Sequence, residues 1–300
     1  MTMNFSFGRL LISVLAAGVL SFPFAGHGAP QNRKLDKARS YVLYYGGVGD
    51  KEQHELSKYD VVIVDPQSMG AEASRRIAEL KRQGCLVIGY LSYMEVASWH
   101  RYRDRVPASW LLKINGKPWK PWGNNRAADL GNAAWRKLLV KLTKSEVIAY
   151  GCDGVFMDTL ADIEHPDLPE AQRRRQLQGL EALMKELRTA YPKFIFIGNW
   201  TVRTTLPVMA KYADVICWEN FQAKFFEPDN EAYAFVTGIR KNLDALQRRY
   251  GFKVYVLWAS PNYYELQDDQ KKMADLARSF GYLPYYCIDD YHTSLTKKKE

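Results

Sequence analysis

Eight short apolar runs, separated by stretches with helical periodicity, constrain the fold of this chain more than any other feature. The runs are rich in β-branched and aromatic residues, and they cover Tyr41–Gly46, Val61–Asp65, Val87–Tyr93, Gly154–Asp158, Phe194–Asn199, Val215–Glu219, Val254–Trp258 and Leu283–Asp289. Their apolar character is continuous, as expected for parallel strands that are covered on both faces. Strands that alternate with helices predict βαβ units.

The stretches between these runs predict the helices. The clearest one places Leu177, Leu180 and Leu187 on one helical face, behind a Pro169-Glu170 pair that suits a first turn. Others lie at Ala71–Gln83, Ala133–Tyr150 and Met273–Phe280. Eight strands in about 250 residues predict the α/β class and a single-domain (β/α)8 TIM barrel. An open, doubly wound sheet is the alternative, but no strand is followed by a glycine-rich phosphate loop.

One connection is much longer than the others. After the third strand, roughly forty residues pass before the next helix, a length that usually marks a functional or a disordered loop. This stretch carries Trp99, Trp110, Trp119 and Trp122. Four tryptophans argue against disorder, so we expect residues 96–125 to form a Trp-rich loop that covers the substrate.

The first 29 residues differ from the rest of the chain. Arg9 is their only charged residue, an apolar run follows from Leu10, and small residues come before Pro30. This pattern predicts a secretory signal peptide over residues 1–29. A short leader over residues 30–40, the barrel over residues 41–292 and a charged tail over residues 293–300 follow. We therefore expect export, to the periplasm or beyond, without stable membrane insertion after cleavage. An uncleaved anchor is the alternative, although the run is short for a membrane span.

Charge and cysteine spacing exclude several classes of partner. The net charge is +9, but no stripe interleaves basic and aromatic residues, so no nucleic-acid partner is expected. The four cysteines are Cys85, Cys152, Cys217 and Cys287. Their spacing fits no metal site. Export would permit a disulfide, for which Cys85 and Cys152 are the candidate pair. No cofactor, metal or particular oligomeric state is indicated.

Acidic residues close five of the eight predicted strands, although the protein is basic overall. They are Asp65, Glu95, Asp158, Glu219 and Asp289. The active sites of barrels lie at the C-terminal ends of the strands. Buried carboxylates are costly unless they are paired or used. Helix caps and rim salt bridges are the alternative roles for these acids, but so many at one rim favour a functional site.

Carboxylates combined with aromatic side chains indicate glycoside hydrolysis, which uses two carboxyl groups on either side of the scissile bond. Asp158 and Glu219 close the strongest apolar strands, so we predict that these two are catalytic. The expected polysaccharide-binding residues are Tyr45, Asp65, Tyr93, Glu95, Asn199, Trp200, Trp218, Trp258 and Asp289. Aromatic faces suit the apolar faces of sugar rings.

Two other functions remain open at this point. A carbohydrate-binding barrel would keep the groove without turnover. A metal-dependent hydrolase would use Asp65, Asp158 and Asp289 as ligands. The five histidines show no H-E-x-x-H spacing, and there is no G-x-S-x-G elbow, which disfavours zinc and serine hydrolases.

Several motifs resemble one known family in the family's order. They are Y-Y-G at Tyr44–Gly46, D-V-V-I-V-D-P at Asp60–Pro66, G-Y-L-S-Y-M-E at Gly89–Glu95, A-D-L at Ala128–Leu130, G-C-D-G-V-F-M-D-T at Gly151–Thr159, G-N-W at Gly198–Trp200 and W-E-N-F at Trp218–Phe221. The chain resembles glycoside hydrolase family 114, the endo-α-1,4-polygalactosaminidase-like barrels, some of which belong to exopolysaccharide systems. The resemblance implies an endo-acting hydrolase of an amino-sugar polysaccharide. It also implies Asp158 as the nucleophile and Glu219 as the general acid/base of a retaining mechanism.

Overall fold

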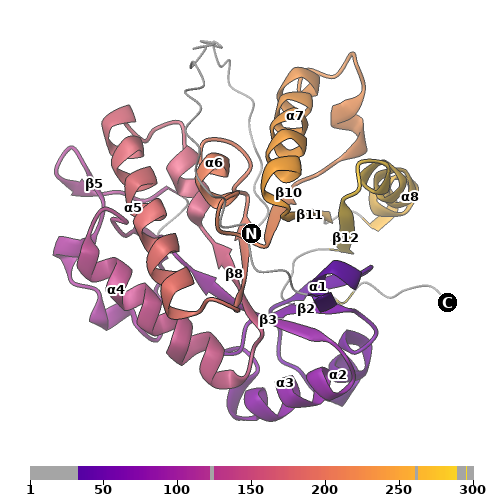
Figure 1. Cartoon of the computed structure of the whole chain (residues 1–300), viewed down its shortest axis with the longest axis horizontal. Helices are drawn as coiled ribbons and strands as arrows, with labels where there is room; N and C mark the ends of the chain where they lie inside the picture. The colour runs from indigo at the N-terminus through magenta and orange to yellow at the C-terminus, as the bar shows by residue number, and fades with distance from the viewer. Residues whose placement is uncertain (1–32, 122–124, 261–262, 289–294, 296–300) are drawn as a thin grey trace.

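Eight parallel strands form the centre of the molecule. A computed structural model describes residues 33–121, 125–260, 263–288 and 295. The strands are β1 (Tyr41–Tyr44), β2 (Val61–Val64), β3 (Leu86–Ser92), β8 (Gly154–Asp158), β9 (Ile195–Asn199), β10 (Val215–Glu219), β11 (Lys253–Ser260) and β12 (Leu283–Ile288). They neighbour one another in that order, and Figure 1 shows helices around them. The predicted (β/α)8 barrel is confirmed, and all eight predicted strands are present within a few residues of their expected bounds.

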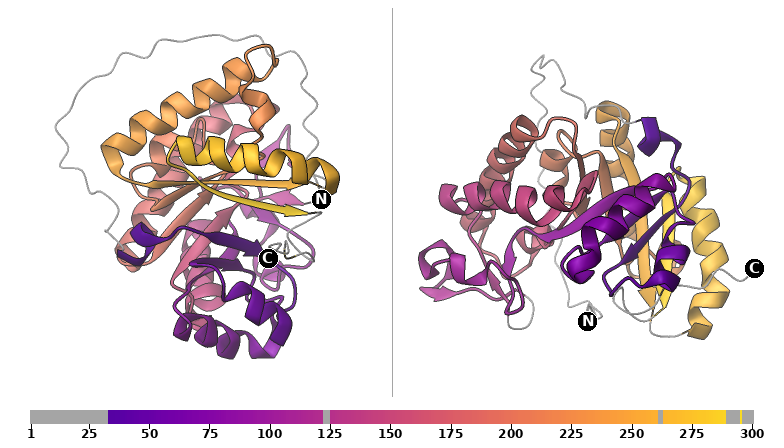
Figure 2. Two further views of the ribbon diagram at one scale, coloured as in Figure 1. Left: turned by 90° about the vertical axis from the view of Figure 1, so that its right-hand side faces the viewer. Right: turned by 90° about the horizontal axis from the view of Figure 1, so that it is seen from below.

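Helices connect these strands and cover the outside of the barrel (Figures 1 and 2). They are α1 (Arg33–Lys37), α2 (Asp50–Leu56), α3 (Ala73–Arg82), α4 (Ala133–Leu142), α5 (Glu170–Ala190), α6 (Leu206–Met209), α7 (Tyr233–Tyr250) and α8 (Tyr263–Ser279). Helix α4 continues into a π-helical turn over Thr143–Val147. The stretches predicted to form α3, α4, α5 and α8 are helical, whereas α7 was not among the predicted helices.

The register of the strands determines which side chains face the barrel interior. Ser92 pairs with Asp158 across β3 and β8, and Asn199 pairs with Cys217 across β9 and β10. Because side chains alternate along a strand and paired residues share a face, each strand sends every second residue inward. Asp158, Asn199 and Glu219 therefore occupy the last inward positions of three adjacent strands.

The barrel closes between β12 and β1 through side chains. The hydrogen-bonded order runs from β1 to β12 and does not continue from β12 to β1 within the described strands. Tyr41 of β1 crosses this gap: its ring stacks on Tyr255 at 4.6 Å and contacts Tyr285 at 5.5 Å. The Tyr41 hydroxyl also donates to the Val256 carbonyl at 2.8 Å. We call this group of tyrosines, Tyr41, Tyr255 and Tyr285, the aromatic seam.

The long connection after β3 contains two small antiparallel ribbons. One pairs β4 (Glu95–Val96) with β7 (Arg126–Ala127). The other pairs β5 (Lys113–Ile114) with β6 (Lys117–Pro118). Because β4 begins three residues after β3 ends, this loop starts at the C-terminal end of the barrel, the end where its predicted role requires it to be.

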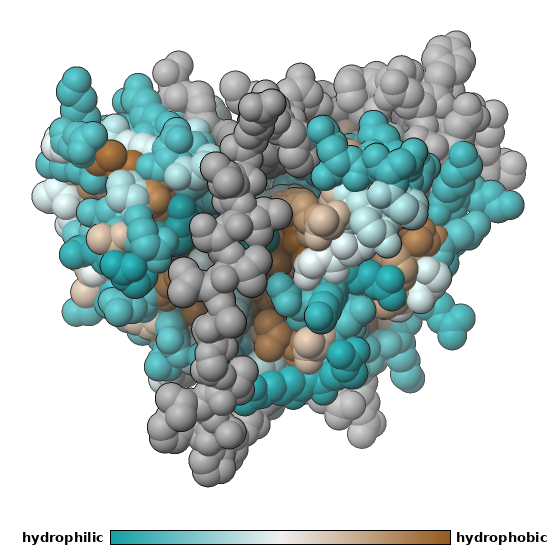
Figure 3. Space-filling model, turned by 90° about the horizontal axis from the view of Figure 1, so that it is seen from above, coloured by the Kyte–Doolittle hydropathy of each residue, from teal (hydrophilic) through white to brown (hydrophobic). Residues whose placement is uncertain are grey.

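In the face that Figure 3 shows, hydrophilic residues cover most of the described surface and hydrophobic residues gather near the centre. Within the part of the chain described here, no helix is long and apolar enough to cross a membrane.

All four cysteines are buried free thiols, so the candidate bridge between Cys85 and Cys152 is not formed. The predicted signal peptide, residues 1–29, lies outside the described residues, as does nearly all of the predicted tail.

Candidate active site

Two carboxylates at the ends of β8 and β10 are joined by one amide on the strand between them. The Asn199 Nδ2 atom donates to Asp158 Oδ1 and to Glu219 Oε2, each at 2.9 Å. Because one nitrogen makes both contacts, the two oxygens lie at most about 5.8 Å apart, twice the length of one hydrogen bond. The structure thus brings together the two predicted catalytic acids and Asn199. The side chain of Asn199 is only 6% exposed, and its Oδ1 atom has no partner among the described residues.

Tyr90 holds the other oxygen of Asp158. Its hydroxyl donates to Asp158 Oδ2 at 3.0 Å, so both oxygens of this carboxylate accept a hydrogen bond. The Tyr45 ring lies 4.6 Å from that of Tyr90. Burial, then the charge of Asp158, raises the pKa of both tyrosines well above the usual value, so both hydroxyls stay protonated.

The backbone turns in the same unusual way after each of the three strands that end at this site. Thr159, Trp200 and Asn220 follow Asp158, Asn199 and Glu219 directly, with φ of 66°, 46° and 59°. Positive φ is rare outside glycine and is an outlier for a β-branched residue such as threonine. Each such residue costs about 1–3 kcal/mol and persists only where its surroundings hold it. The strain lies beside the residues that carry the proposed chemistry.

Glu95 adds a third carboxyl group beside the pair. It is 7% exposed, and its Oε2 atom accepts a hydrogen bond from Asn125 Nδ2 at 2.6 Å. Burial raises the pKa of Glu95 from 4.5 to about 7, and the charge of Asp158 adds to this, against the bond from Asn125. Glu95 therefore changes its charge near neutral pH.

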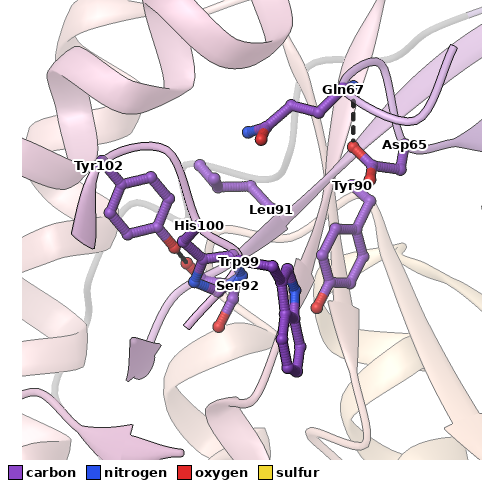
Figure 4. Close-up of a pocket in the computed structure, with 8 residues that line it drawn as sticks. All are labelled: Asp65, Gln67, Tyr90, Leu91, Ser92, Trp99, His100 and Tyr102. Atoms are coloured by element: carbon purple, nitrogen blue, oxygen red, sulfur yellow. Dashed lines mark hydrogen bonds between the residues drawn. The ribbon is translucent and has the colours of Figure 1, made fainter. Parts of the chain in front are cut away.

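A pocket lies beside Tyr90 and is lined in part by residues of the long loop (Figure 4). Its lining residues are Asp65, Gln67, Tyr90, Leu91, Ser92, Trp99, His100 and Tyr102. Trp99, with 71% of its surface exposed, gives the pocket an open aromatic wall. Asp65 accepts hydrogen bonds from the Gln67 backbone at 2.9 Å and the Ser68 hydroxyl at 2.6 Å. This acid thus both caps its own turn and faces the pocket.

The structure does not bring every predicted binding residue to the acids. Tyr93 is fully buried and bonds Thr143 of the π-helical turn at 2.8 Å. Trp218 packs on Phe221 and Phe226, and Trp258 lies in a separate cluster with Met273 and Tyr286. These three side chains point away from the acids: Tyr93 turns to the π-helical turn, and Trp218 and Trp258 directly neighbour inward positions and so face outward from the barrel. Trp200 is half-buried against the core. Asp289 lies outside the described residues.

Two residues of the site, Thr159 and Asn125, were not predicted to belong to it. Tyr90 is one of the aromatic residues expected beside the acids at the strand ends, and strand alternation also points to it, because it stands two residues before Ser92 on the face that carries Asp158. Asn125 gives no such signal, since it comes from a loop 30 residues after Glu95. Within the described ranges, no three His, Cys, Asp or Glu side chains lie close enough together to hold a metal ion.

Comparison with known proteins assigns the chain to a family. The model of glycoside-hydrolase family GH114 matches residues 27–237, more than half of the chain. The chain belongs to family GH114. It is therefore a glycoside hydrolase, as the resemblance of its motifs implied. An uncharacterised protein of Deinococcus radiodurans is 26% identical over 243 residues, which cover 76% of this chain and 73% of that protein.

Two solved structures have a similar fold. The glycoside hydrolase domain of PelA from Pseudomonas aeruginosa has a TM-score of 0.67 at 23% identity, covering 83% of this chain and 94% of that domain. Ega3 from Aspergillus fumigatus, solved in complex with galactosamine, has a TM-score of 0.61 at 16% identity, covering 89% of this chain and 95% of the other. At these identities the similarity concerns the fold.

Proposed function

We propose that the protein hydrolyses an amino-sugar-containing polysaccharide by a retaining double displacement, with Asp158 as nucleophile and Glu219 as general acid/base. The observation that carries this proposal is the Asn199 amide, which bonds both carboxylates. Retaining glycosidases keep their carboxyl groups about 5–5.5 Å apart, whereas inverting ones need about 6.5–9.5 Å for a water molecule. Oxygens at most about 5.8 Å apart, as the amide requires, support retention.

In the first step, an Asp158 oxygen attacks the anomeric carbon. The bond from that carbon to the leaving oxygen breaks, and the proton of Glu219 moves to the leaving oxygen. In the second step, a water molecule attacks the same carbon, its proton returns to Glu219, and the bond to Asp158 breaks. Tyr90 and Asn199 support both steps, because their donors stabilise Asp158 whenever it is a free carboxylate.

The charge around the site supports a substrate that carries amino groups. Asp65, Glu95 and Asp158 form no ion pair with a described Lys, Arg or His side chain. A net charge of +9 would repel a polycation at long range, but local acids act within a Debye length of about 8 Å. The galactosamine in the Ega3 structure agrees with this choice of sugar. Partial N-acetylation of the polymer would weaken the repulsion further.

Export completes the proposed function, because an extracellular polysaccharide requires an enzyme outside the cytoplasm. The signal-like residues 1–29 support it. Fractionation of cells that express the full chain, followed by N-terminal sequencing of the mature protein, tests this. A cleaved protein outside the cytoplasm is expected, and an uncleaved protein that stays in the cytoplasm would contradict export.

The decisive experiment measures reducing-sugar release from partially acetylated polygalactosamine. Wild type is compared with Asp158→Asn and Glu219→Gln, and with Asp153→Asn as a matched control. Asp153 directly precedes β8 at its other end, where it bonds Lys81. We expect both site variants to lose activity by a factor of about 10³ or more, while the control stays active. NMR of the first product then shows its anomeric configuration, and an inverted product would overturn the retaining mechanism.

Two other outcomes would redirect the assignment. A wild type that binds the polymer without cutting it, and an Asp158→Asn variant that binds equally well, would indicate a non-catalytic binding barrel. Activity that disappears with EDTA and returns with added metal would indicate the metal-dependent alternative. We expect full activity in EDTA.

A further inference from the structure

One hydroxyl group links the proposed nucleophile to the loop beside it. Thr159 directly follows Asp158, and its φ of 66° turns its side chain back toward the end of β3. Its Oγ1 atom accepts hydrogen bonds from three consecutive backbone N–H groups, those of Tyr93 at 3.2 Å, Met94 at 2.8 Å and Glu95 at 3.2 Å. Three successive N–H groups that converge on one point resemble the backbone nests that bind anions. Here a threonine oxygen fills the nest.

The same hydroxyl also lies against both flanking strands. It is 2.7 Å from the Asp158 carbonyl, to which it donates, and 3.0 Å from the Ser92 hydroxyl. Ser92 in turn donates to the Glu95 carbonyl at 2.9 Å. The Asp158 carbonyl also accepts from the Tyr93 N–H at 3.0 Å. The ends of β3 and β8 and the segment Tyr93–Glu95 therefore form one hydrogen-bonded unit around Thr159.

This unit carries groups from both sides of the site. Asp158 belongs to it through its backbone, and Glu95 is its last residue. The loop with Trp99, which lines the pocket, continues from it. A small rotation at Thr159 would move the nucleophile relative to the loop, and a displacement of about 1 Å can cost a factor of 10² in rate.

We propose that Thr159 is a positioning residue, whose hydroxyl fixes the backbone of Asp158 against the Tyr93–Glu95 segment. This inference rests on the proposed function for its effect on turnover, but its structural part stands independently. A purely architectural threonine would contribute to stability alone. A positioning threonine instead changes kcat while the protein remains folded.

The test compares Thr159→Val with Thr159→Ser. Valine keeps the shape and the β-branch but removes the oxygen, whereas serine keeps the oxygen and removes the methyl group. The first readout is hydrogen exchange at the amides of Met94 and Glu95 in the full-length protein, with the Tyr93 amide, which keeps its bond to the Asp158 carbonyl, as the internal reference. We expect exchange to rise at least about tenfold in the valine variant and to stay near wild type in the serine variant. Equal protection in all three folded proteins would overturn the hydrogen-bonded unit.

The second readout is turnover of partially acetylated polygalactosamine. The valine variant is expected to lose about 10- to 100-fold in kcat with KM within about threefold of wild type, and serine is expected to restore most of kcat. Wild-type kcat in a folded valine variant would overturn the positioning role. An inactive wild type whose amides respond as expected would contradict the proposed function and leave the hydrogen-bonded unit standing.

Discussion

The two sides of this barrel are built from similar strands but end in different ways. On one side, β8, β9 and β10 end in Asp158, Asn199 and Glu219, which one amide nitrogen connects. On the other side, β11, β12 and β1 meet through Tyr41, Tyr255 and Tyr285. The first side concentrates strained backbone and acids at its rim. The second is held by stacked rings and by one hydroxyl that donates to a backbone carbonyl.

The side with the acids thus carries the proposed chemistry, whereas the side with the aromatic seam closes the barrel. Buried polar atoms cost stability on both sides, since the Asn199 Oδ1 atom at the rim and the Tyr255 hydroxyl at the seam have no partner among the described residues. Aromatic packing at the seam adds stability without placing a charged group near the substrate. Substitutions on the two sides should therefore affect different measurements, and the predictions below test that separation.

The largest effect is expected at the amide between the acids. Asn199→Ala removes the donor to both carboxyl groups and should lower kcat by about 10²- to 10³-fold, because Asp158 then loses one of its two donors and the pair loses the group that holds it together. Steady-state kinetics measure this, with circular dichroism as the check on folding. A folded alanine variant with more than half of the wild-type kcat would show that the amide does not organise the pair.

A matched pair of tyrosines compares the two sides directly. Tyr90→Phe removes the hydroxyl that donates to Asp158 and should lower kcat about tenfold. Tyr41→Phe removes the hydroxyl that donates to the Val256 carbonyl. It should lower the free energy of unfolding by about 1–2 kcal/mol and leave kcat unchanged. Denaturant titration and kinetics on both variants make the comparison, and a lower kcat in Tyr41→Phe would contradict the division.

Glu95 predicts a pH dependence of stability on the acid side. Its folded-state pKa is raised from 4.5 to about 7, so the folded protein holds this proton more tightly than the unfolded chain does. The stability from the protonated carboxyl is fully present below pH 4.5 and is lost as pH rises through about 7. The free energy of unfolding of Glu95→Gln should therefore be higher than that of wild type by about 1–3 kcal/mol at pH 8, and the two should be equal at pH 4. Thermal melts across this range test it, with the exposed Glu170→Gln as a control expected to show no such divergence.

The smallest effect is expected at the open wall of the pocket. Trp99→Ala should raise KM about three- to tenfold with little change in kcat, because an exposed ring contributes to binding and not to bond cleavage. Tyr233→Ala, which removes another exposed aromatic ring, serves as the control. Equal changes in KM for both variants would show that Trp99 does not bind the substrate.

The local pattern of apolar residues in the sequence was sufficient to predict the eight strands, because strands that are covered on both faces are apolar throughout. It was also sufficient to bring Asp158, Asn199 and Glu219 to one rim. It did not give the direction of Trp218 and Trp258, since the strand-end positions were selected without counting inward and outward alternation from Glu219. The bond from Asn125 to Glu95 spans a long loop. Only the three-dimensional path of that loop determines this contact, and no spacing in the sequence encodes it.

The left-handed turns at Thr159, Trp200 and Asn220 have a consequence for engineering heat resistance. Replacing a strained non-glycine residue by glycine relieves steric conflict in the folded protein but adds conformational freedom to the unfolded chain. In this enzyme, each of those three positions is covalently bonded to Asp158, Asn199 or Glu219. A search for thermostable variants that ignores turnover would not detect a displaced carboxyl group or amide at these positions. Melting temperature and activity therefore have to be measured together for every change there.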